Sequence, residues 1–354
     1  MTAFLEERLS SRKKAGNLRT LQPSHYNLID FASNDYLGLA KSMGTTTGGG
    51  ATGSRLLTGN SQLAFEIEEL LARFHGYEAA LLCNCGYMAN LALMMTVAGE
   101  QDAIFFDVAV HASIRDGIRL SRAQAFAFRH NDCMHLEKRL KNSSSKGTCF
   151  ICVESIYSTD GSIAPLEAIC EVAARYGAHV IVDEAHATGV WGPQGRGLVA
   201  HLGLTKAVFA HVVTFGKALG TFGACILSSA FVKEGLINFA TPFIYTTALP
   251  LCVLHAIRAS YERFPYMEKE RNHIYQLIAV FSSLCERASR TQVQFIRCPG
   301  NRALREAALK MRACGFDVSP LMSPTVARGE ERLRICLHAF NTREELTILC
   351  RELL

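Results

Sequence analysis

The stretch Val180-Ile-Val-Asp-Glu-Ala-His186 places an acidic residue and a histidine directly behind a short apolar run. A continuous apolar run is typical of a strand that is buried on both faces of a parallel sheet. Asp183 would then stand at the carboxyl end of the strand, where open α/β sheets bind their ligands. An ionised carboxylate there needs a cation or a protonated heterocycle opposite it. Asp183 and His186 are therefore the first candidate site residues.

A second strand end carries a lysine. The apolar run 208–213 leads into Thr214-Phe-Gly-Lys-Ala-Leu-Gly220, a turn that is rich in small residues. Small neighbours leave room beside the amine, and desolvation makes such a lysine a Schiff-base nucleophile. Alone, Lys217 has a plainer interpretation as an exposed turn lysine, and Asp183 as one partner of a salt bridge. An aspartate and a lysine at two strand ends are the protein groups that a pyridoxal phosphate site needs.

Three further strand ends carry polar or glycine-containing loops. The segment Leu82-Cys-Asn-Cys-Gly-Tyr87 runs from a strand into a helix, whose free N–H groups suit a phosphate at Gly86 and Tyr87. His111 follows an apolar strand and could stack on a flat ring, although a lone histidine is more often a core residue. Ser158 lies in the loop Glu154–Gly161 and could hydrogen-bond a ring oxygen. Each signal is weak alone, and together they favour one site at the carboxyl edge of a sheet.

The rest of the pattern alternates strands with helices, which indicates an α/β fold with a mostly parallel sheet covered on both faces. The expected strands are 79–82, 103–106, 125–129, 149–153, 178–183 and 208–214. The expected helices are 63–74, 86–97, 114–120, 134–140 and 166–176. From about residue 241 the pattern changes to longer helices, short strands at 292–296 and 333–337, and a final helix. We expect an N-terminal arm (1–33), a large domain (34–240) and a smaller α+β domain (241–354).

Composition excludes several classes of protein. With 49% apolar and 19% charged residues among 354, the chain can build a sizeable core and is not disordered. The net charge of +5 is spread along the chain, whereas nucleic-acid-binding domains usually have a stronger and clustered excess of basic residues. No apolar run is long enough for a membrane span or resembles a signal peptide. The thirteen cysteines then indicate a reducing, cytoplasmic location without disulfides.

Two metal-dependent alternatives are disfavoured. Asp-Glu-Ala-His is also a helicase motif, but that class requires a phosphate loop of the form G-x-x-x-x-G-K-[ST], which the chain lacks. Cys149 and Cys152 lie three apart on an expected strand and so face opposite sides. Cys83 and Cys85 have no second pair with zinc-like spacing. We expect no metal site.

The order of these motifs resembles the α-oxoamine synthases, which are pyridoxal phosphate enzymes of fold type I, the aspartate aminotransferase-like fold. The resemblance runs from about residue 31 to the end of the chain. The matching segments are Phe31–Leu39, Gly53–Asn60, the segment around His111, Ser158–Gly161, Asp183–His186, Gly195–Gly197, Thr214–Lys217 and Pro324–Val326.

The resemblance implies a role for each matching position. Lys217 would bind pyridoxal 5'-phosphate covalently and then serve as the base, and Asp183 would keep the pyridine nitrogen protonated. The other cofactor contacts would come from Gly86, Tyr87, His111, Ser158, His186 and Thr214, with Thr246 and Thr247 reaching the phosphate of the neighbouring subunit in an obligate homodimer. The substrates would meet Arg19, Asn34, His111, Thr325 and Arg334.

The implied reaction condenses L-alanine with a pimeloyl thioester and releases carbon dioxide, as in biotin biosynthesis. The thioester carrier, coenzyme A or acyl carrier protein, stays open. Three alternative functions also stay open. They are glycine C-acetyltransferase, a synthase that uses serine or glycine with another acyl-CoA, and a catalytically silent assembly subunit. Two departures bear on the choice of substrate. Only Ala40 to Thr47 stands where family members usually carry an additional helix, and Met322 stands where an arginine is frequent.

Overall fold

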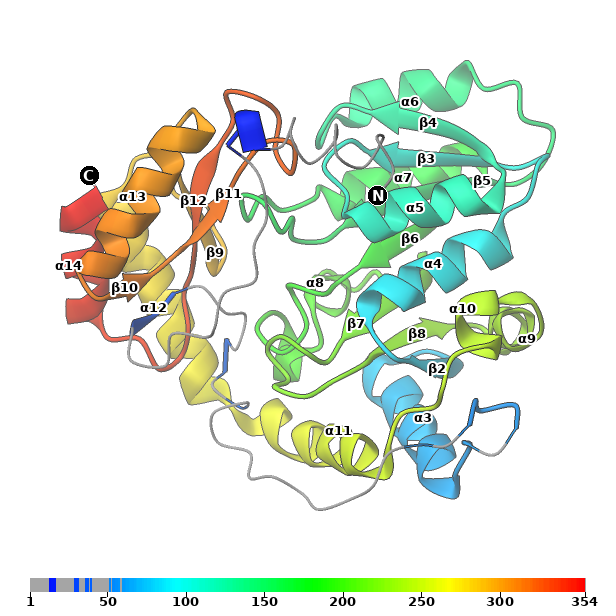
Figure 1. The fold of residues 1–354 in the computed structure, drawn as a ribbon. Coiled ribbons are helices and arrows are strands. Elements are labelled where there is room, and N and C mark those ends of the chain that lie inside the picture. Colours follow the sequence, from blue (N-terminus) through cyan, green and yellow to red (C-terminus); the bar gives the residue numbers. More distant parts are fainter. Residues whose placement is uncertain are drawn as a thin grey trace. The chain divides into compact units, whose positions relative to one another are not determined.

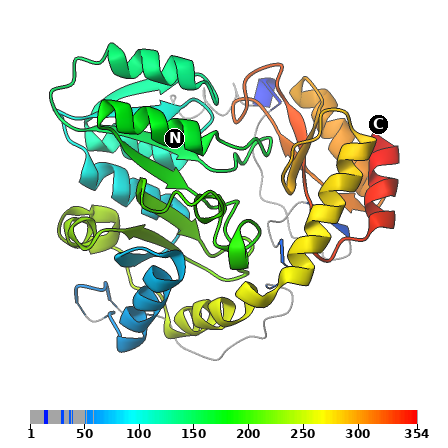
Figure 2. The same cartoon turned by 180° about the vertical axis from the view of Figure 1, so that it is seen from behind.

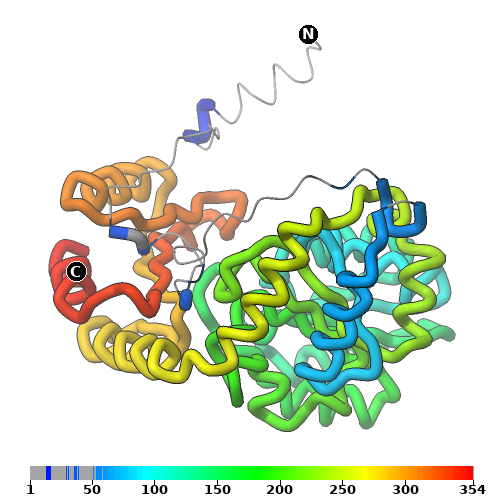
Figure 3. The backbone as a smooth tube through the Cα atoms, turned by 90° about the horizontal axis from the view of Figure 1, so that it is seen from below, coloured from blue at the N-terminus to red at the C-terminus, as the bar shows by residue number. Residues whose placement is uncertain are grey.

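The computed structural model describes residues 13–16, 29–31, 36–37, 39, 51, 53–57 and 59–353. The chain packs into two compact units. The larger contains Leu37–Tyr157 and Ile163–Arg271, and the smaller contains Met1–Tyr36, Ser158–Ser162 and Asn272–Leu354. Helix α12 (Glu268–Leu284) contains the last of the boundaries between them along the chain, at 271/272, and Figure 3 follows it in yellow. The domain boundary predicted at 240/241 falls within the larger unit.

A seven-stranded sheet forms the centre of the larger unit, in the order β2-β8-β7-β6-β5-β3-β4 (Figure 1). Its strands are β2 (Ala79–Cys83), β3 (Ala103–Asp107), β4 (Gln124–Phe128), β5 (Cys149–Glu154), β6 (His179–Asp183), β7 (Val208–Thr214) and β8 (Ala224–Ser228). Strands β4, β3, β5, β6 and β7 pair in parallel, and β8 is antiparallel to both β7 and β2. The predicted α/β fold with a mostly parallel sheet is confirmed.

Helices cover both faces of this sheet. The helices of the larger unit are α3 (Gln62–His75), α4 (Gly86–Val97), α5 (Ala112–Ser121), α6 (Cys133–Lys141), α7 (Leu166–Tyr176), α8 (Leu198–His201), α9 (Ala230–Phe239), α10 (Thr241–Ile244) and α11 (Leu251–Arg263). Helices α4 and α5 lie side by side on one face, and α7 lies on the opposite face, seen in Figure 2. The sequence assigned every α-helix from α3 to α7 and missed β8, because its short apolar run Ala224–Leu227 does not distinguish a strand from a buried helix.

Local sequence signals explain where these elements begin and end. The Ser61 side chain accepts a hydrogen bond from the Ala64 N–H and so caps the start of α3. Gly76 ends the helix with φ of 78°, a left-handed conformation that glycine adopts without strain. The apolar side chains of β5 and β6 are almost fully buried, as expected for strands covered on both faces.

The smaller unit contains a three-stranded antiparallel sheet in the order β11-β12-β9. These strands are β9 (Val293–Arg297), β11 (Ser319–Leu321) and β12 (Arg332–Cys336), and β1 (Ile29–Asp30) pairs in parallel with β10 (Phe316–Asp317). Helices α13 (Asn301–Ala313) and α14 (Arg343–Leu353) belong to the same unit. Strands β9 and β12 confirm two predicted strands within one or two residues.

No helix within the described part of the chain is long and apolar enough to cross a membrane. All thirteen cysteines are described, and each is a free thiol. The described residues contain no group of three or more histidine, cysteine, aspartate or glutamate side chains arranged to hold a metal ion.

Candidate active site

The carboxyl ends of four neighbouring parallel strands meet at one edge of the large sheet. The strand register places Glu154 of β5 beside Asp183 of β6, and Asp183 beside Val212 of β7. Strand β3 ends at Asp107 beside the end of β5, because Phe106 pairs with Cys152. The candidate residues after these strands therefore lie along one edge, as the sequence predicted.

Asp183 is held by hydrogen bonds on both carboxylate oxygens. It is 6% exposed, its Oδ2 accepts from Asn90 Nδ2 at 2.7 Å, and its Oδ1 accepts from the Ala185 N–H at 2.9 Å. His186 is buried three residues further along. Sequence reasoning missed Asn90, although a lone amide in the otherwise apolar run Met88–Met95 was the available signal. Two acceptor bonds fix the direction of the Asp183 carboxylate.

His111 begins helix α5 and lies among groups from three elements. Its N–H donates to Glu154 Oε1 at 2.7 Å, and its Nδ1 lies 2.8 Å from Ser113 Oγ. The ring meets the Tyr87 ring edge-on, with centroids 6.2 Å apart. Tyr87 in turn donates to Asp116, and this hydrogen bond raises the pKa of the phenol. The imidazole is thus fixed in place while its surface stays exposed.

Three charges act on the His111 imidazole. Loss of water around the ring lowers its pKa, Asp183 and Asp116 oppose that effect, and the Lys217 ammonium adds to it. The net pKa of His111 lies below its ordinary value. Because an aspartate after β6 and a lysine after β7 both act on one ring, the structure brings Asp183, Lys217 and His111 together.

The start of helix α4 offers a cradle for an anion. Gly86 is its first residue, and no side chain caps the helix at Cys85. A Cβ atom at position 86 would lie 2.5 Å from Thr214 Cγ2, so a larger residue there would require the Thr214 side chain to move. The hydroxyl oxygen of Thr214 is buried and has no hydrogen-bond partner among the described residues. Helix N–H groups and an unsatisfied hydroxyl are what a phosphate requires.

A second buried acid lies directly beside Asp183 and has a different environment. Glu184 is fully buried, and its Oε1 accepts from the N–H groups of Leu198 and Val199 at 2.7 and 3.1 Å. Its Oε2 lies 2.9 Å from His211 Nε2. Gly197 has φ of 102°, and a Cβ there would lie 2.0 Å from Oε2. The carboxylate of Glu184 therefore explains a glycine in the Gly195–Gly197 motif.

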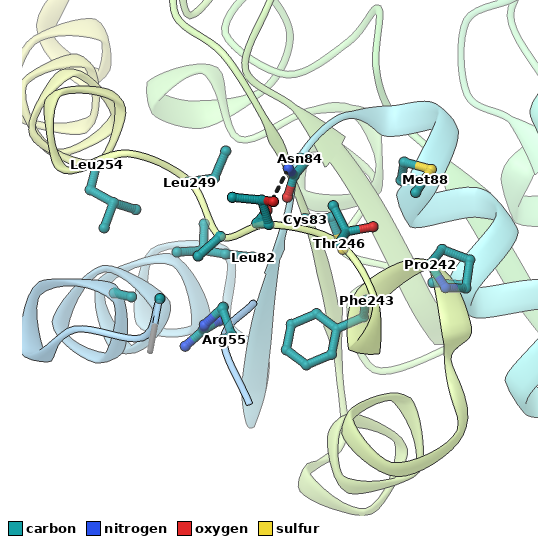
Figure 4. Close-up of a pocket in the computed structure, with 15 residues that line it drawn as sticks. Arg55, Leu82, Cys83, Asn84, Met88, Pro242, Phe243, Thr246, Leu249 and Leu254 are labelled. Atoms are coloured by element: carbon teal, nitrogen blue, oxygen red, sulfur yellow. Dashed lines mark hydrogen bonds between the residues drawn. The ribbon is translucent and has the colours of Figure 1, made fainter. Parts of the chain in front are cut away.

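Thr246 and Thr247 line a pocket of about 460 Å³ in the larger unit (Figure 4). Asn84 Nδ2 donates to the Thr247 carbonyl oxygen at 2.9 Å, the dashed line in Figure 4. Thr247 also pairs with Ser54 as an isolated antiparallel bridge. These contacts tie the threonine segment to the end of β2, immediately before the start of α4. The predicted contact with the phosphate of a neighbouring subunit stays a prediction.

The remaining predicted substrate residues fall in the smaller unit or outside the described residues. Arg334 donates to the Ser158 carbonyl oxygen at 3.3 Å, which joins β12 to the segment Ser158–Ser162. Thr325 is exposed, and its N–H donates to the Met322 carbonyl oxygen at 2.8 Å. Arg19, Asn34 and the shortened connection Ala40–Thr47 lie outside the described residues.

Comparison with known proteins identifies the family. The model of the family described as aminotransferase class I and II matches residues 26–353. The chain belongs to that family. It is 34% identical to the 8-amino-7-oxononanoate synthase of Methylobacillus flagellatus over 368 residues, covering 97% of this chain and 93% of that protein. It is 37% identical to the synthase of the same name from Emericella nidulans over 379 residues, covering 96% and 90%.

Solved structures of related enzymes share the fold. A serine palmitoyltransferase from Sphingomonas wittichii is 26% identical with a TM-score of 0.88, covering 99% of this chain and 95% of that one. The 8-amino-7-oxononanoate synthase of Francisella tularensis is 29% identical with a TM-score of 0.80, covering 93% and 97%. The predicted membership of the α-oxoamine synthases and the fold-type-I architecture are both confirmed.

This aminotransferase-family member is a pyridoxal phosphate-dependent acyltransferase. The residues present fit the cofactor: the cradle at Gly86 and Thr214 suits its phosphate, and the held carboxylate of Asp183 suits a protonated ring nitrogen. Lys217 stands on the strand end next to that of Asp183.

Proposed function

We propose that the protein condenses L-alanine with a pimeloyl thioester, releases carbon dioxide and forms 8-amino-7-oxononanoate for biotin synthesis. The observation that carries the proposal is that the held carboxylate of Asp183 ends β6, Lys217 follows the neighbouring strand β7, and the cradle at Gly86 and Thr214 adjoins the end of β7. The choice of product rests on relatives of that name, which are 34–37% identical over at least 90% of this chain. The acyl carrier is coenzyme A or acyl carrier protein.

The cofactor supplies an electron sink that makes the α-proton of a bound amino acid acidic. Asp183 maintains that sink by holding the ring nitrogen protonated, and the Asn90 hydrogen bond directs its carboxylate. Lys217 would hold the resting cofactor, and its free amine would take the α-proton of the bound amino acid. The α-carbon would bond to the acyl carbonyl carbon as the thiolate leaves, the carboxylate would depart as carbon dioxide, and the Lys217 ammonium would return a proton to the α-carbon.

The other predicted residues hold the reactants. His111 lies against the cofactor ring, with His186 and Ser158 at the ring hydroxyl. Arg334 binds the amino-acid carboxylate through its planar guanidinium, together with Asn34, and Thr325 and Arg19 line the acyl channel. Arg334 is a better candidate than Arg332 on the same strand, because Arg332 lies 3.6 Å from Asp160 and 3.3 Å from Glu330 in ion pairs.

The proposal includes a cytoplasmic homodimer in which each active site is completed by Thr246 and Thr247 of the neighbouring subunit. Asn84 and Met88, which lie on either side of Gly86, line the same pocket as the threonine segment, and this supports a place for that segment near the phosphate. The thirteen free thiols are consistent with a reducing compartment.

A second candidate reaction is the condensation of serine with a long-chain acyl thioester. It is favoured by the higher TM-score to serine palmitoyltransferase, 0.88 against 0.80 for the oxononanoate synthase. A turnover panel separates the two by crossing alanine, glycine and serine with acetyl, pimeloyl and palmitoyl thioesters. We expect the highest kcat/KM for alanine with the pimeloyl thioester. A maximum for serine with the palmitoyl thioester would replace the proposal, and no turnover with any pair would leave a silent assembly subunit.

A further inference from the structure

A continuous chain of side chains joins Asp183 to His111 through Asn90, which directs the Asp183 carboxylate, and through Ser113, which has no role in the scheme above. Asn90 Nδ2 donates to Asp183 Oδ2 at 2.7 Å and to Ser113 Oγ at 3.0 Å. Ser113 Oγ lies 2.8 Å from His111 Nδ1. Asn90 and Ser113 are 1% and 0% exposed, so water does not compete for these bonds.

The direction of each bond follows from the chemistry of its partners. A carboxylate only accepts hydrogen bonds, so the Asn90 group facing Asp183 is the amide NH₂, which only donates. The same NH₂ must then donate to Ser113, and the hydroxyl oxygen accepts. The remaining hydroxyl proton points to His111 Nδ1, which also receives the Ser113 N–H at 3.3 Å. Nδ1 thus accepts two hydrogen bonds and carries no proton.

We propose that Asn90 and Ser113 are positioning residues that fix His111 as the neutral tautomer with its proton on Nε2, and that they link this tautomer to the orientation of Asp183. His111 then offers a hydrogen-bond donor at Nε2 and no base. Proton removal is left to Lys217. The inference concerns residues of the resting enzyme and does not depend on which amino acid or thioester is the substrate.

The charges around His111 do not by themselves select a tautomer. Asp183 after β6 and Asp116 on α5 favour the imidazolium, Lys217 after β7 disfavours it, and Glu154 of β5 binds the His111 N–H. The lowered pKa of His111 agrees with a ring whose Nδ1 is occupied as an acceptor. Two hydrogen bonds from Ser113, one from its hydroxyl and one from its backbone N–H, distinguish Nδ1 from Nε2, and the hydroxyl bond makes the inference testable at that residue.

The test is ¹H–¹⁵N correlation of the holoenzyme labelled with [¹⁵N]histidine, because protonated and unprotonated ring nitrogens have separate shifts. A His111→Gln variant assigns the signal. We expect the Nε2–H tautomer in the wild type at neutral pH. Ser113→Ala removes the hydroxyl bond to Nδ1 but keeps the backbone N–H bond, so we expect a detectable share of the Nδ1–H tautomer and a higher pKa of His111 than in the wild type.

Two further variants complete the design. Ser121→Ala is the matched control, because Ser121 is a buried serine on the same helix that donates only to the Ile118 carbonyl oxygen at 2.7 Å. We expect it to leave the His111 signal unchanged. Asn90→Ala frees the Ser113 hydroxyl to rotate and should also give both tautomers, so it tests the relay even if Ser113→Ala does not fold. An Nδ1–H tautomer in the wild type, or a His111 signal in Ser113→Ala identical to that in Ser121→Ala, would overturn the proposal.

Discussion

Asp183 and Glu184 are adjacent acids at the end of one strand, yet the protein uses them differently. The Asp183 carboxylate accepts hydrogen bonds from the Asn90 amide and the Ala185 N–H, and its charge affects the pKa of His111. Glu184 receives the N–H groups of two residues at the start of α8 and lies beside His211. Alternate residues of a strand point to opposite faces, so neighbours in sequence serve different surroundings.

The difference shows which acid is available to a ligand. The carboxylate of Glu184 is fully buried, its Oε1 accepts two backbone N–H groups and its Oε2 lies beside His211, so it is placed to hold the structure together. Asp183 keeps its direction through a relay that leads to the exposed His111. We infer that Asp183 acts on the cofactor and that Glu184 acts on the stability of the sheet edge.

The largest expected effect is on catalysis, in Asp183→Asn. The amide can still accept the Asn90 hydrogen bond, but it cannot keep the ring nitrogen protonated. Turnover should fall by at least about a hundredfold, corresponding to roughly 3 kcal/mol in the barrier. The free energy of unfolding should change little, and part of the cofactor should stay bound through its phosphate. Steady-state kinetics measure the turnover, and the cofactor absorbance measures how much cofactor stays bound. Turnover within a few-fold of the wild type would refute the pyridinium role.

The matched change Glu184→Gln should show the opposite pattern. Glutamine keeps the side-chain volume of Glu184 but removes the negative charge. That charge strengthens the two hydrogen bonds from backbone N–H groups and lies beside His211. We expect the holoenzyme to lose about 2–3 kcal/mol of unfolding free energy, while kcat stays within a few-fold of the wild type. Urea unfolding and initial rates on the same preparation provide the measurement. If turnover collapsed as in Asp183→Asn with no loss of stability, the division of roles between the two acids would be wrong.

A smaller effect is expected on strand β12, where a similar contrast separates Arg332 from Arg334. Lysine at 334 cannot form the bidentate bond to a carboxylate, so Arg334→Lys should weaken alanine binding by about 2 kcal/mol, or roughly thirtyfold. Arg332→Lys is the control and should leave alanine affinity nearly unchanged. Titration of alanine against the cofactor spectrum decides the matter, and an unchanged affinity in Arg334→Lys would assign the carboxylate clamp to another residue.

The sequence predicted the parallel sheet and a candidate site at the carboxyl ends of its strands, because buried strands leave continuous apolar runs and because Asp183 and Lys217 lie at or just after two of them. It could not separate the roles of Asp183 and Glu184, since the contacts of Glu184 come from residues 198, 199 and 211. Asn90 was missed for a similar reason, because its partners Asp183 and Ser113 are distant in the chain. Contacts that depend on long-range packing leave little trace in local sequence patterns.

The most direct test of the central claim is to locate the cofactor on the chain. Borohydride reduction of the holoenzyme, followed by peptide mapping, converts the cofactor–lysine bond into a stable label. We predict that the label lies on Lys217 and that the Lys217→Ala variant shows neither label nor turnover. A label on any other lysine of the wild-type enzyme would contradict the account.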